Sequence, residues 1–139
     1  MARLIFRFKK RRLQDGSHSP EPKIPVTYST SHASLETMAY LDSGSTISYL
    51  PLELAEALGF KRETARTEKA SGIGGAQEVG CFHTDIRLTR HSQSIRMNHI
   101  EMLVFLDPSI EYVIIGLSPF FEKHDVNFRL KSDRIEIRE

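Results

Sequence analysis

Apolar and polar residues alternate along much of the chain, which is the pattern of strands that bury one face. The alternation begins at Leu4, Phe6 and Phe8 and returns in several later segments, namely 24–30, 34–41, 80–88, 95–106, 126–130 and 135–137. Residues 113–116 form a continuous apolar run that ends in glycine, as expected for a strand buried on both faces. The polar residues 131–134, between the last two segments, predict a hairpin turn.

Two short helices are expected to interrupt these strands. The first, over residues 51–58, begins with a proline, carries leucines four residues apart and ends at Gly59. Ser118 and Pro119 can start a second helix that runs to residue 123. The sequence therefore predicts a mainly β, single-domain fold with two short helices.

The segment after the first strand is polar. Lys9–Arg12 is basic, and residues 14–25 contain prolines and an Asp15-Gly16 turn signal, so we expect an irregular loop there. A basic run of four residues could touch nucleic acid or an acidic partner, but we interpret it as a solvated strand end and expect no nucleic acid. We accordingly divide the chain into an N-terminal strand and polar loop, residues 1–23, and a main domain, residues 24–139.

Composition describes an ordinary globular protein and excludes several classes. The chain has 139 residues, a length that suits one domain, and 40% of them are hydrophobic. Its net charge of +1 does not indicate any particular class of binding partner. Cys81 is the only cysteine, so no intrachain disulfide can form and a reducing, cytoplasmic location is expected. No apolar run approaches the roughly 20 residues that span a bilayer, so we expect no membrane contact. The histidines lack metal-ligand spacing, and a Cys81 nucleophile paired with His83 has no further support, so no metal is expected.

The stretch Asp42-Ser43-Gly44-Ser45 carries the most informative chemistry. It occurs once and lies between two apolar, strand-like runs. An acid followed by a small residue and a glycine places a carboxylate on a tight turn against an apolar base. Asp42 is therefore the candidate catalytic acid.

A second glycine-rich stretch, Ser71-Gly72-Ile73-Gly74-Gly75, reads as the tip of a hairpin. It is not a phosphate-binding loop, because no Gly-Lys-Ser/Thr follows and no strand and helix frame it.

Four features resemble those of the retroviral-type aspartic proteases, the half-sized relatives of pepsin, and they occur in the same order along the chain. They are the acid turn at 42–45, the glycine-rich tip at 72–75, the run Ile114-Ile115-Gly116 and the strand-bearing ends of the chain. The resemblance covers roughly residue 24 to the C-terminus. It implies a retropepsin-like acid-protease barrel with a flap hairpin. It also implies an aspartic endopeptidase that cleaves extended peptides without metal or organic cofactor.

The resemblance also implies a homodimer, because the mechanism needs two carboxylates and this chain has one such turn. Asp42 of each copy would meet on a two-fold axis, and Ser43 would form a hydrogen bond across it. Gly44 would let the backbone approach the catalytic water, and the Ser45 hydroxyl would donate to the carboxylate. Residues 71–75 would close over the peptide, and Ile114 with Ile115 would line its binding wall.

Two other interpretations remain open. The chain could be a catalytically inactive dimerisation module with this fold, or a peptide-binding module that uses the same cleft. One departure from the viral pattern concerns the dimer contacts: the Ile-Ile-Gly run is followed by Leu117, where viral members have arginine.

Overall fold

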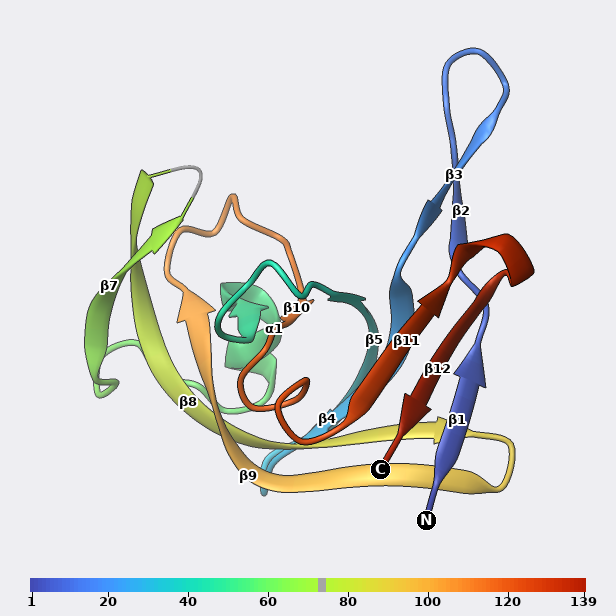
Figure 1. The fold of residues 1–139 in the computed structure, drawn as a ribbon. Coiled ribbons are helices and arrows are strands. Elements are labelled where there is room, and N and C mark those ends of the chain that lie inside the picture. Colours follow the sequence, from blue (N-terminus) through green and yellow to red (C-terminus); the bar gives the residue numbers. More distant parts are fainter. Residues whose placement is uncertain (73–74) are drawn as a thin grey trace.

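The computed structural model describes residues 1–72 and 75–139, and three sheets organise them (Figure 1). The largest has seven strands in the order β4-β5-β10-β6-β9-β8-β7, and β4 also pairs with β8. Its strands are β4 (Lys23–Ser29), β5 (Ser34–Leu41), β6 (Tyr49–Pro51), β7 (Thr67–Gly72), β8 (Gly75–Arg90), β9 (Gln93–Phe105) and β10 (Ile114–Ile115). Residues Ile73 and Gly74 of the expected hairpin tip lie outside the described residues.

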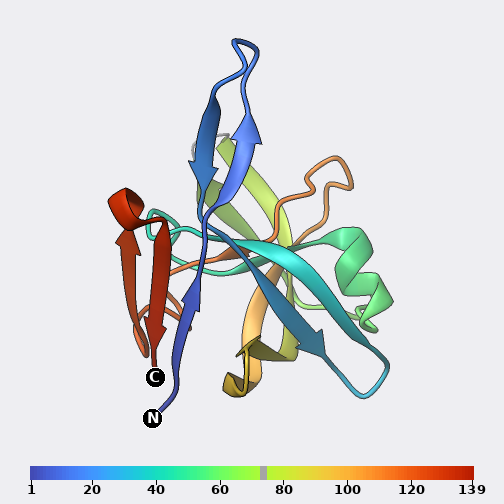
Figure 2. The same ribbon diagram turned by 90° about the vertical axis from the view of Figure 1, so that its right-hand side faces the viewer.

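Two smaller sheets contain the chain ends. The first, in the order β1-β12-β11, joins β1 (Arg3–Phe6), β12 (Arg134–Arg138) and β11 (Asp125–Arg129). The second is a hairpin of β2 (Lys9–Arg12) and β3 (His18–Glu21) that stands away from the body in both ribbon views (Figures 1 and 2). The prediction of a mainly β chain is therefore confirmed.

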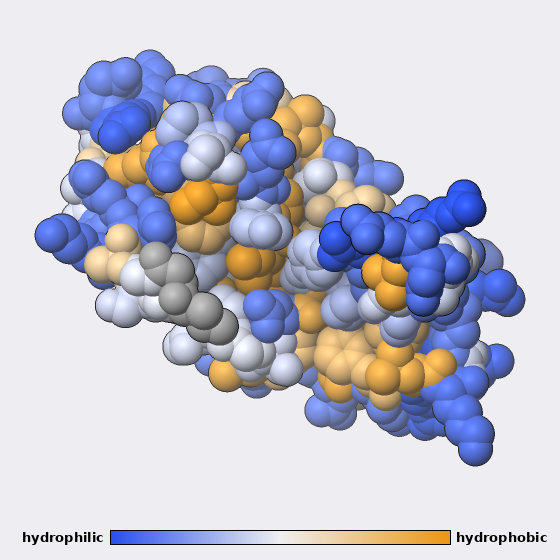
Figure 3. All heavy atoms as spheres, turned by 90° about the horizontal axis from the view of Figure 1, so that it is seen from above, coloured by the Kyte–Doolittle hydropathy of each residue, from blue (hydrophilic) through white to orange (hydrophobic). Residues whose placement is uncertain are grey.

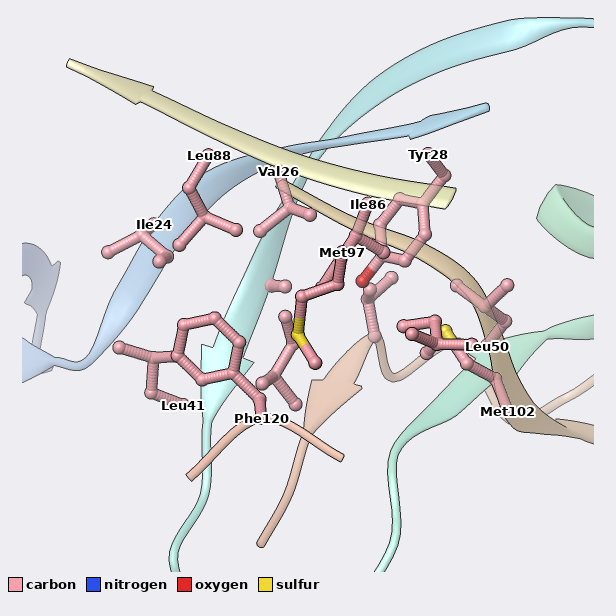
Figure 4. Close-up of a cluster of buried hydrophobic side chains, with 14 of the residues drawn as sticks. Ile24, Val26, Tyr28, Leu41, Leu50, Ile86, Leu88, Met97, Met102 and Phe120 are labelled. Carbon is pink, nitrogen blue, oxygen red and sulfur yellow. The ribbon is translucent and has the colours of Figure 1, made fainter. Parts of the chain in front are cut away.

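The core lies between the curved β8–β9 pair, the β4–β5 pair and the segment that follows β10. Phe120 lies beside Leu41 in this core, with Ile24 and Val26 of β4 above them (Figure 4). All four residues are buried, and burial alternates along β4, as in a strand that turns one face inward. The core therefore anchors the last residue of β5, directly before the acid turn.

The first expected helix is confirmed as α1 (Leu52–Ala57), with Pro51 as its N-cap and Ala55 and Leu58 fully buried. The second expected helix, over residues 118–123, is wrong. Turns occupy this segment, with the Glu122 N–H donating to Leu117 O at 3.0 Å. The physical reason is tertiary, because the Ser118 N–H donates to Thr46 O at 2.9 Å and Phe120 enters the core. A short 3-10 helix, η1 (Leu130–Ser132), instead forms the turn between β11 and β12.

The expectation of an irregular loop over residues 9–25 is also wrong. Lys9–Arg12 pairs with His18–Glu21 in an antiparallel ladder. The turn between them is closed by the Gly16 N–H, which donates to Leu13 O at 3.0 Å, and Gly16 has a positive φ of 86°. Backbone hydrogen bonds hold this hairpin although none of the side chains of β2 is buried.

Glu136 joins the two chain ends. Its carboxylate accepts hydrogen bonds from Arg3 Nε at 3.0 Å and from Arg138 Nε at 2.7 Å, and only 4% of the residue is exposed. The hydrogen bond from Arg3, followed by that from Arg138, lowers the pKa of Glu136 from 4.5 to about 2 against the opposing effect of burial.

Glu136→Gln is expected to lower the thermal unfolding midpoint at neutral pH and to have no effect near pH 2. Between pH 4.5 and about 2 the unfolded chain binds a proton that the folded chain does not. The stabilisation is therefore complete above pH 4.5 and is lost as the pH falls toward 2. Unfolding midpoints at pH 7, 4 and 2 check this, with the exposed Glu63→Gln as a control. An equal deficit at all three pH values would contradict the assignment.

Within the described parts of the chain, no helix combines the length and the apolar content that crossing a membrane requires.

Candidate active site

Asp42 follows the last residue of β5, and neighbouring strands fix its backbone. Its N–H donates to Ile115 O at 2.9 Å, and the N–H of Tyr40 donates to Val113 O at the same distance. The parallel pairing of β5 with β10 therefore brings the acid turn to the Ile-Ile-Gly run, two motifs that are about 70 residues apart in sequence. The Asp42 side chain is exposed at the end of this ladder.

The loop after Asp42 is fastened at its base by residues 116–118. The Leu117 N–H donates to Ser45 O at 2.8 Å, and the buried Ser48 hydroxyl donates to Ser118 O while it accepts from the Gly116 N–H, both at 3.0 Å. Gly116 must lack a side chain here, because a Cβ would lie 2.6 Å from Ser45 O. Sequence reasoning missed Ser48. The only signal for it was a polar residue inside an apolar run.

Within the turn, the backbone orients the carboxylate. The Gly44 N–H donates to Asp42 Oδ1 at 2.9 Å, and the Ser45 N–H donates to Asp42 O at 3.1 Å. A Cβ on Gly44 would lie 3.1 Å from Asp42 Oδ1, so a glycine at this position leaves the space beside that oxygen free.

The expected role of Ser45 is wrong in this structure. Its hydroxyl donates to Ile47 O at 2.7 Å, and a hydroxyl has one proton to donate. Ser45 therefore stabilises the loop rather than the charge of Asp42. Ser43 is exposed beside it on the turn.

Asp42 lines a cleft with a volume of about 1050 Å³. Gly44 and Ser45 line the cleft beside it, and Ser71, Gly72 and Gly75 of the β7–β8 hairpin line it from the other side. In the view from above, apolar atoms lie at the bottom of a hollow between hydrophilic margins (Figure 3). The structure thus brings the acid turn and the glycine-rich hairpin to one cleft.

The two isoleucines of the Ile-Ile-Gly run lie on opposite faces of β10. Ile114 lines the cleft, whereas Ile115 is 1% exposed and packs in the core. Alternation along a strand places them on opposite faces, so of the two only Ile114 can contact a ligand in the cleft.

A stacked aromatic pair in the cleft was not predicted. Tyr49 and Phe105, which both line the cleft, have ring centroids 4.7 Å apart and an interplanar angle of 8°. They come from the neighbouring parallel strands β6 and β9, whose pairing could not be read from the sequence. Burial, and secondarily the charge of Glu68, raises the pKa of the Tyr49 phenol, so it remains a neutral hydrogen-bond donor.

Within the part of the chain that the structure describes, Cys81 and His83 make their side-chain contacts with other residues and not with each other. Cys81 Sγ lies 3.4 Å from Arg66 Nη2, while the His83 ring stacks on His99 with centroids 4.4 Å apart. Among residues 1–72 and 75–139, no three His, Cys, Asp or Glu side chains gather as metal ligands do. The cleft at Asp42 is therefore the candidate site.

Comparison with known families decides the relationship. A family model described as aspartyl protease matches residues 25–118, the segment that holds the acid turn, the hairpin and the Ile-Ile-Gly run. The chain belongs to the aspartyl protease family. A comparison with curated protein sequences finds no match.

Solved structures support the family at the level of fold. The chain superimposes on a retropepsin-like aspartic protease from Rickettsia conorii with a TM-score of 0.58 and 17% identity, over 98% of this chain and 90% of that one. It also superimposes on the retroviral protease-like domain of Ddi1 from Leishmania major, with a TM-score of 0.54 and 24% identity, over 83% and 86% of the two chains. The chain therefore has the retropepsin-like fold that the sequence motifs predicted.

Proposed function

We propose that this protein is an aspartic endopeptidase that hydrolyses peptide bonds as a homodimer, with Asp42 from each copy in one shared site. The observation that carries the proposal is the cleft itself. Among the described residues that line it, Asp42 is the only aspartate, and the other carboxylate, Glu68, belongs to the β7–β8 hairpin.

A second copy would complete this site. Catalysis by this family requires two carboxylates that hold a water and share one proton. The Asp42 side chain is exposed in the single chain, so it is accessible to a symmetry-related Asp42. An interface on a two-fold axis brings the same residue of each copy together. In such a pair the exposed Ser43 is placed to form hydrogen bonds between the two turns.

The chemistry follows from the pairing of like charges. Two carboxylates about 3 Å apart cannot both ionise, so one stays protonated at mildly acid pH. The ionised carboxylate takes a proton from the water as the water oxygen bonds to the peptide carbonyl carbon, while the protonated carboxyl gives its proton to the carbonyl oxygen. The resulting tetrahedral intermediate then breaks its C–N bond: the carboxyl that took the proton from water passes it to the leaving amine nitrogen, and the other carboxylate takes back a hydroxyl proton, which restores the pair with one shared proton. The Gly44 N–H, bound to Asp42 Oδ1, holds each carboxylate in orientation.

The substrate would be an extended peptide. The β7–β8 hairpin, which lines the cleft with Ser71, Gly72 and Gly75, would act as a flap over the cleft and exclude water. Ile114, Tyr49 and Phe105 offer apolar contacts from the floor and walls. Backbone hydrogen bonds would supply affinity and these side chains would supply preference.

The test is cleavage of a peptide library with apolar central residues between pH 3 and 7. We expect cleavage with an acid optimum, because the shared proton is lost as the pH rises. A statine-containing peptide, which mimics the tetrahedral intermediate, should inhibit it. A dimer that binds extended peptides but cleaves none at any pH would contradict the proposal and favour the binding-module interpretation.

A further inference from the structure

The hairpin of β2 and β3, residues 9–21, is here called the basic arm. It projects from the body in the same direction as the β7–β8 hairpin (Figures 1 and 2). The first 23 residues carry seven Lys or Arg and two Asp or Glu, although the whole chain has a net charge of only +1. All four residues of Lys9–Arg12 are exposed. The arm itself, residues 9–21, carries four Lys or Arg and two Asp or Glu, so it is a locally basic projecting element.

The ladder of the basic arm sorts its side chains onto two faces. Residues paired directly across an antiparallel ladder share a face, and successive residues alternate between faces. Lys9 pairs with Glu21 and Arg11 with Ser19, so these four share one face. Lys10 pairs with Pro20 and Arg12 with His18, and these four share the other.

Contacts at the base of the arm show which face borders the cleft. The Glu21 carboxylate accepts a hydrogen bond from the Tyr40 hydroxyl, and Tyr40 and Pro22 both line the cleft. On the opposite face, Lys10 Nζ lies 3.0 Å from Asp133 Oδ1, in the turn between β11 and β12. Lys9 and Arg11 therefore share the face that borders the cleft, and Lys10 and Arg12 face away.

On the cleft-bordering face of the ladder, the one carboxylate is Glu21, which lies directly across from Lys9 and partly offsets its charge, whereas Arg11 lies across from the neutral Ser19. Glu21 is engaged by Tyr40 through one carboxylate oxygen, and its other oxygen lies 3.9 Å from Lys23 Nζ. Among the described residues, neither Lys9 nor Arg11 forms an ion pair with a carboxylate of the chain. Lys9 and Arg11 lie outside the cleft, beyond its rim at Pro22 and Tyr40, whereas the charged residues that line the cleft itself are Asp42, Glu68 and Lys69.

We propose that Lys9 and Arg11 select substrates with acidic residues in the stretch of peptide that leaves the cleft past the basic arm. This proposal rests on the proposed peptidase function and names the substrate class of that site. Charges at the rim of a binding site act mainly on specificity and on the association rate, and they are screened by salt. The planar Arg11 guanidinium can also bind a carboxylate in a bidentate manner.

The test compares two peptides with the same apolar centre and with flanks of either glutamate or glutamine. We expect the protein to cleave the glutamate peptide with a kcat/KM about threefold to tenfold higher at low salt, and this ratio to fall toward one at ~0.5 M salt. Lys9→Ala with Arg11→Ala should bring the ratio close to one. Lys10→Ala with Arg12→Ala removes the same charge from the opposite face and should keep the ratio. Lys9→Glu with Arg11→Glu should reverse the preference toward a lysine-flanked peptide.

Binding measured with the Asp42→Asn protein separates this proposal from the proposed function. Fluorescence anisotropy should show tighter binding of the glutamate peptide, with the same dependence on Lys9 and Arg11. If no peptide is cleaved but this preference holds, the peptidase function fails and the acidic-peptide site stands. If both peptides are cleaved equally and also bound equally, the acidic-peptide site is overturned and the peptidase function stands.

Three further outcomes would also overturn the acidic-peptide site. An equal loss of preference in both double alanine variants would show a general charge effect without face specificity. Dissociation of the dimer in Lys9→Ala with Arg11→Ala, measured by sedimentation, would assign the arm to a second copy of the chain. An RNA oligonucleotide that binds the arm more tightly than the glutamate peptide, through the same two residues, would assign it to nucleic acid.

Discussion

Asp42→Asn is expected to abolish peptide cleavage while the fold and the dimer persist. Asparagine has nearly the same shape, and its Oδ1 can still accept the hydrogen bond that the Gly44 N–H donates at 2.9 Å. Its amide can neither take a proton from water nor share one with a second copy. Loss of general acid–base catalysis at both positions should lower kcat/KM by about 10⁴-fold or more.

The measurement pairs kcat/KM with the sedimentation coefficient and the unfolding midpoint. Asp125→Asn is the matched control, since Asp125 is exposed on β11 and outside the cleft, and it should retain full activity. Substantial cleavage by Asp42→Asn would remove Asp42 from the mechanism.

Gly116→Ala is expected to have the second-largest effect, on both stability and activity. A Cβ at this position would lie 2.6 Å from Ser45 O and closer still to Ile47 O, both in the loop that follows Asp42. These are backbone atoms and cannot rotate away, so the loop must shift. Such overpacking typically costs about 1–3 kcal/mol of unfolding free energy. Because the loop carries Asp42, kcat/KM should fall as well.

Gly72→Ala provides the stability control for that substitution. Nothing lies within 4 Å of the position that a Cβ would take on Gly72, so its unfolding free energy should stay close to that of the parent. Urea unfolding of both variants gives the comparison. A Gly116→Ala protein as stable and as active as the parent would contradict the idea that residues 116–118 hold the acid turn.

The sequence was sufficient for features that depend on local pattern. Alternation predicted most strands of the main sheet, because one face of each is buried and the other is exposed. The acid turn was recognisable because an aspartate and a glycine follow directly after a strand-like run. The Ile-Ile-Gly run was recognisable because a glycine ends a continuous apolar stretch. Their order along the chain then led to the family, which the match over residues 25–118 establishes.

What the sequence could not supply depends on tertiary contacts or on backbone pairing. Residues 118–123 have helix-start residues, but their backbone is used to hold the acid loop, and Phe120 is drawn into the core. The acceptor of the Ser45 hydroxyl, Ile47 O, lies two residues away and is selected by the bend of the loop. In the basic arm, Lys9–Arg12 lacks apolar residues, so alternation gave no signal. The Asp15-Gly16 turn was the one local indication of that hairpin.

The central claim is that two copies of Asp42 form one catalytic centre, and mixing the parent protein with Asp42→Asn tests it most directly. The two proteins are combined in equal amounts, allowed to exchange subunits and assayed at a fixed total concentration. If both carboxylates are required, only parent homodimers cleave, and activity should be about a quarter of that of the undiluted parent, following the square of its fraction. Activity at one half, in direct proportion to the parent fraction, would mean that each chain works alone and would contradict the account.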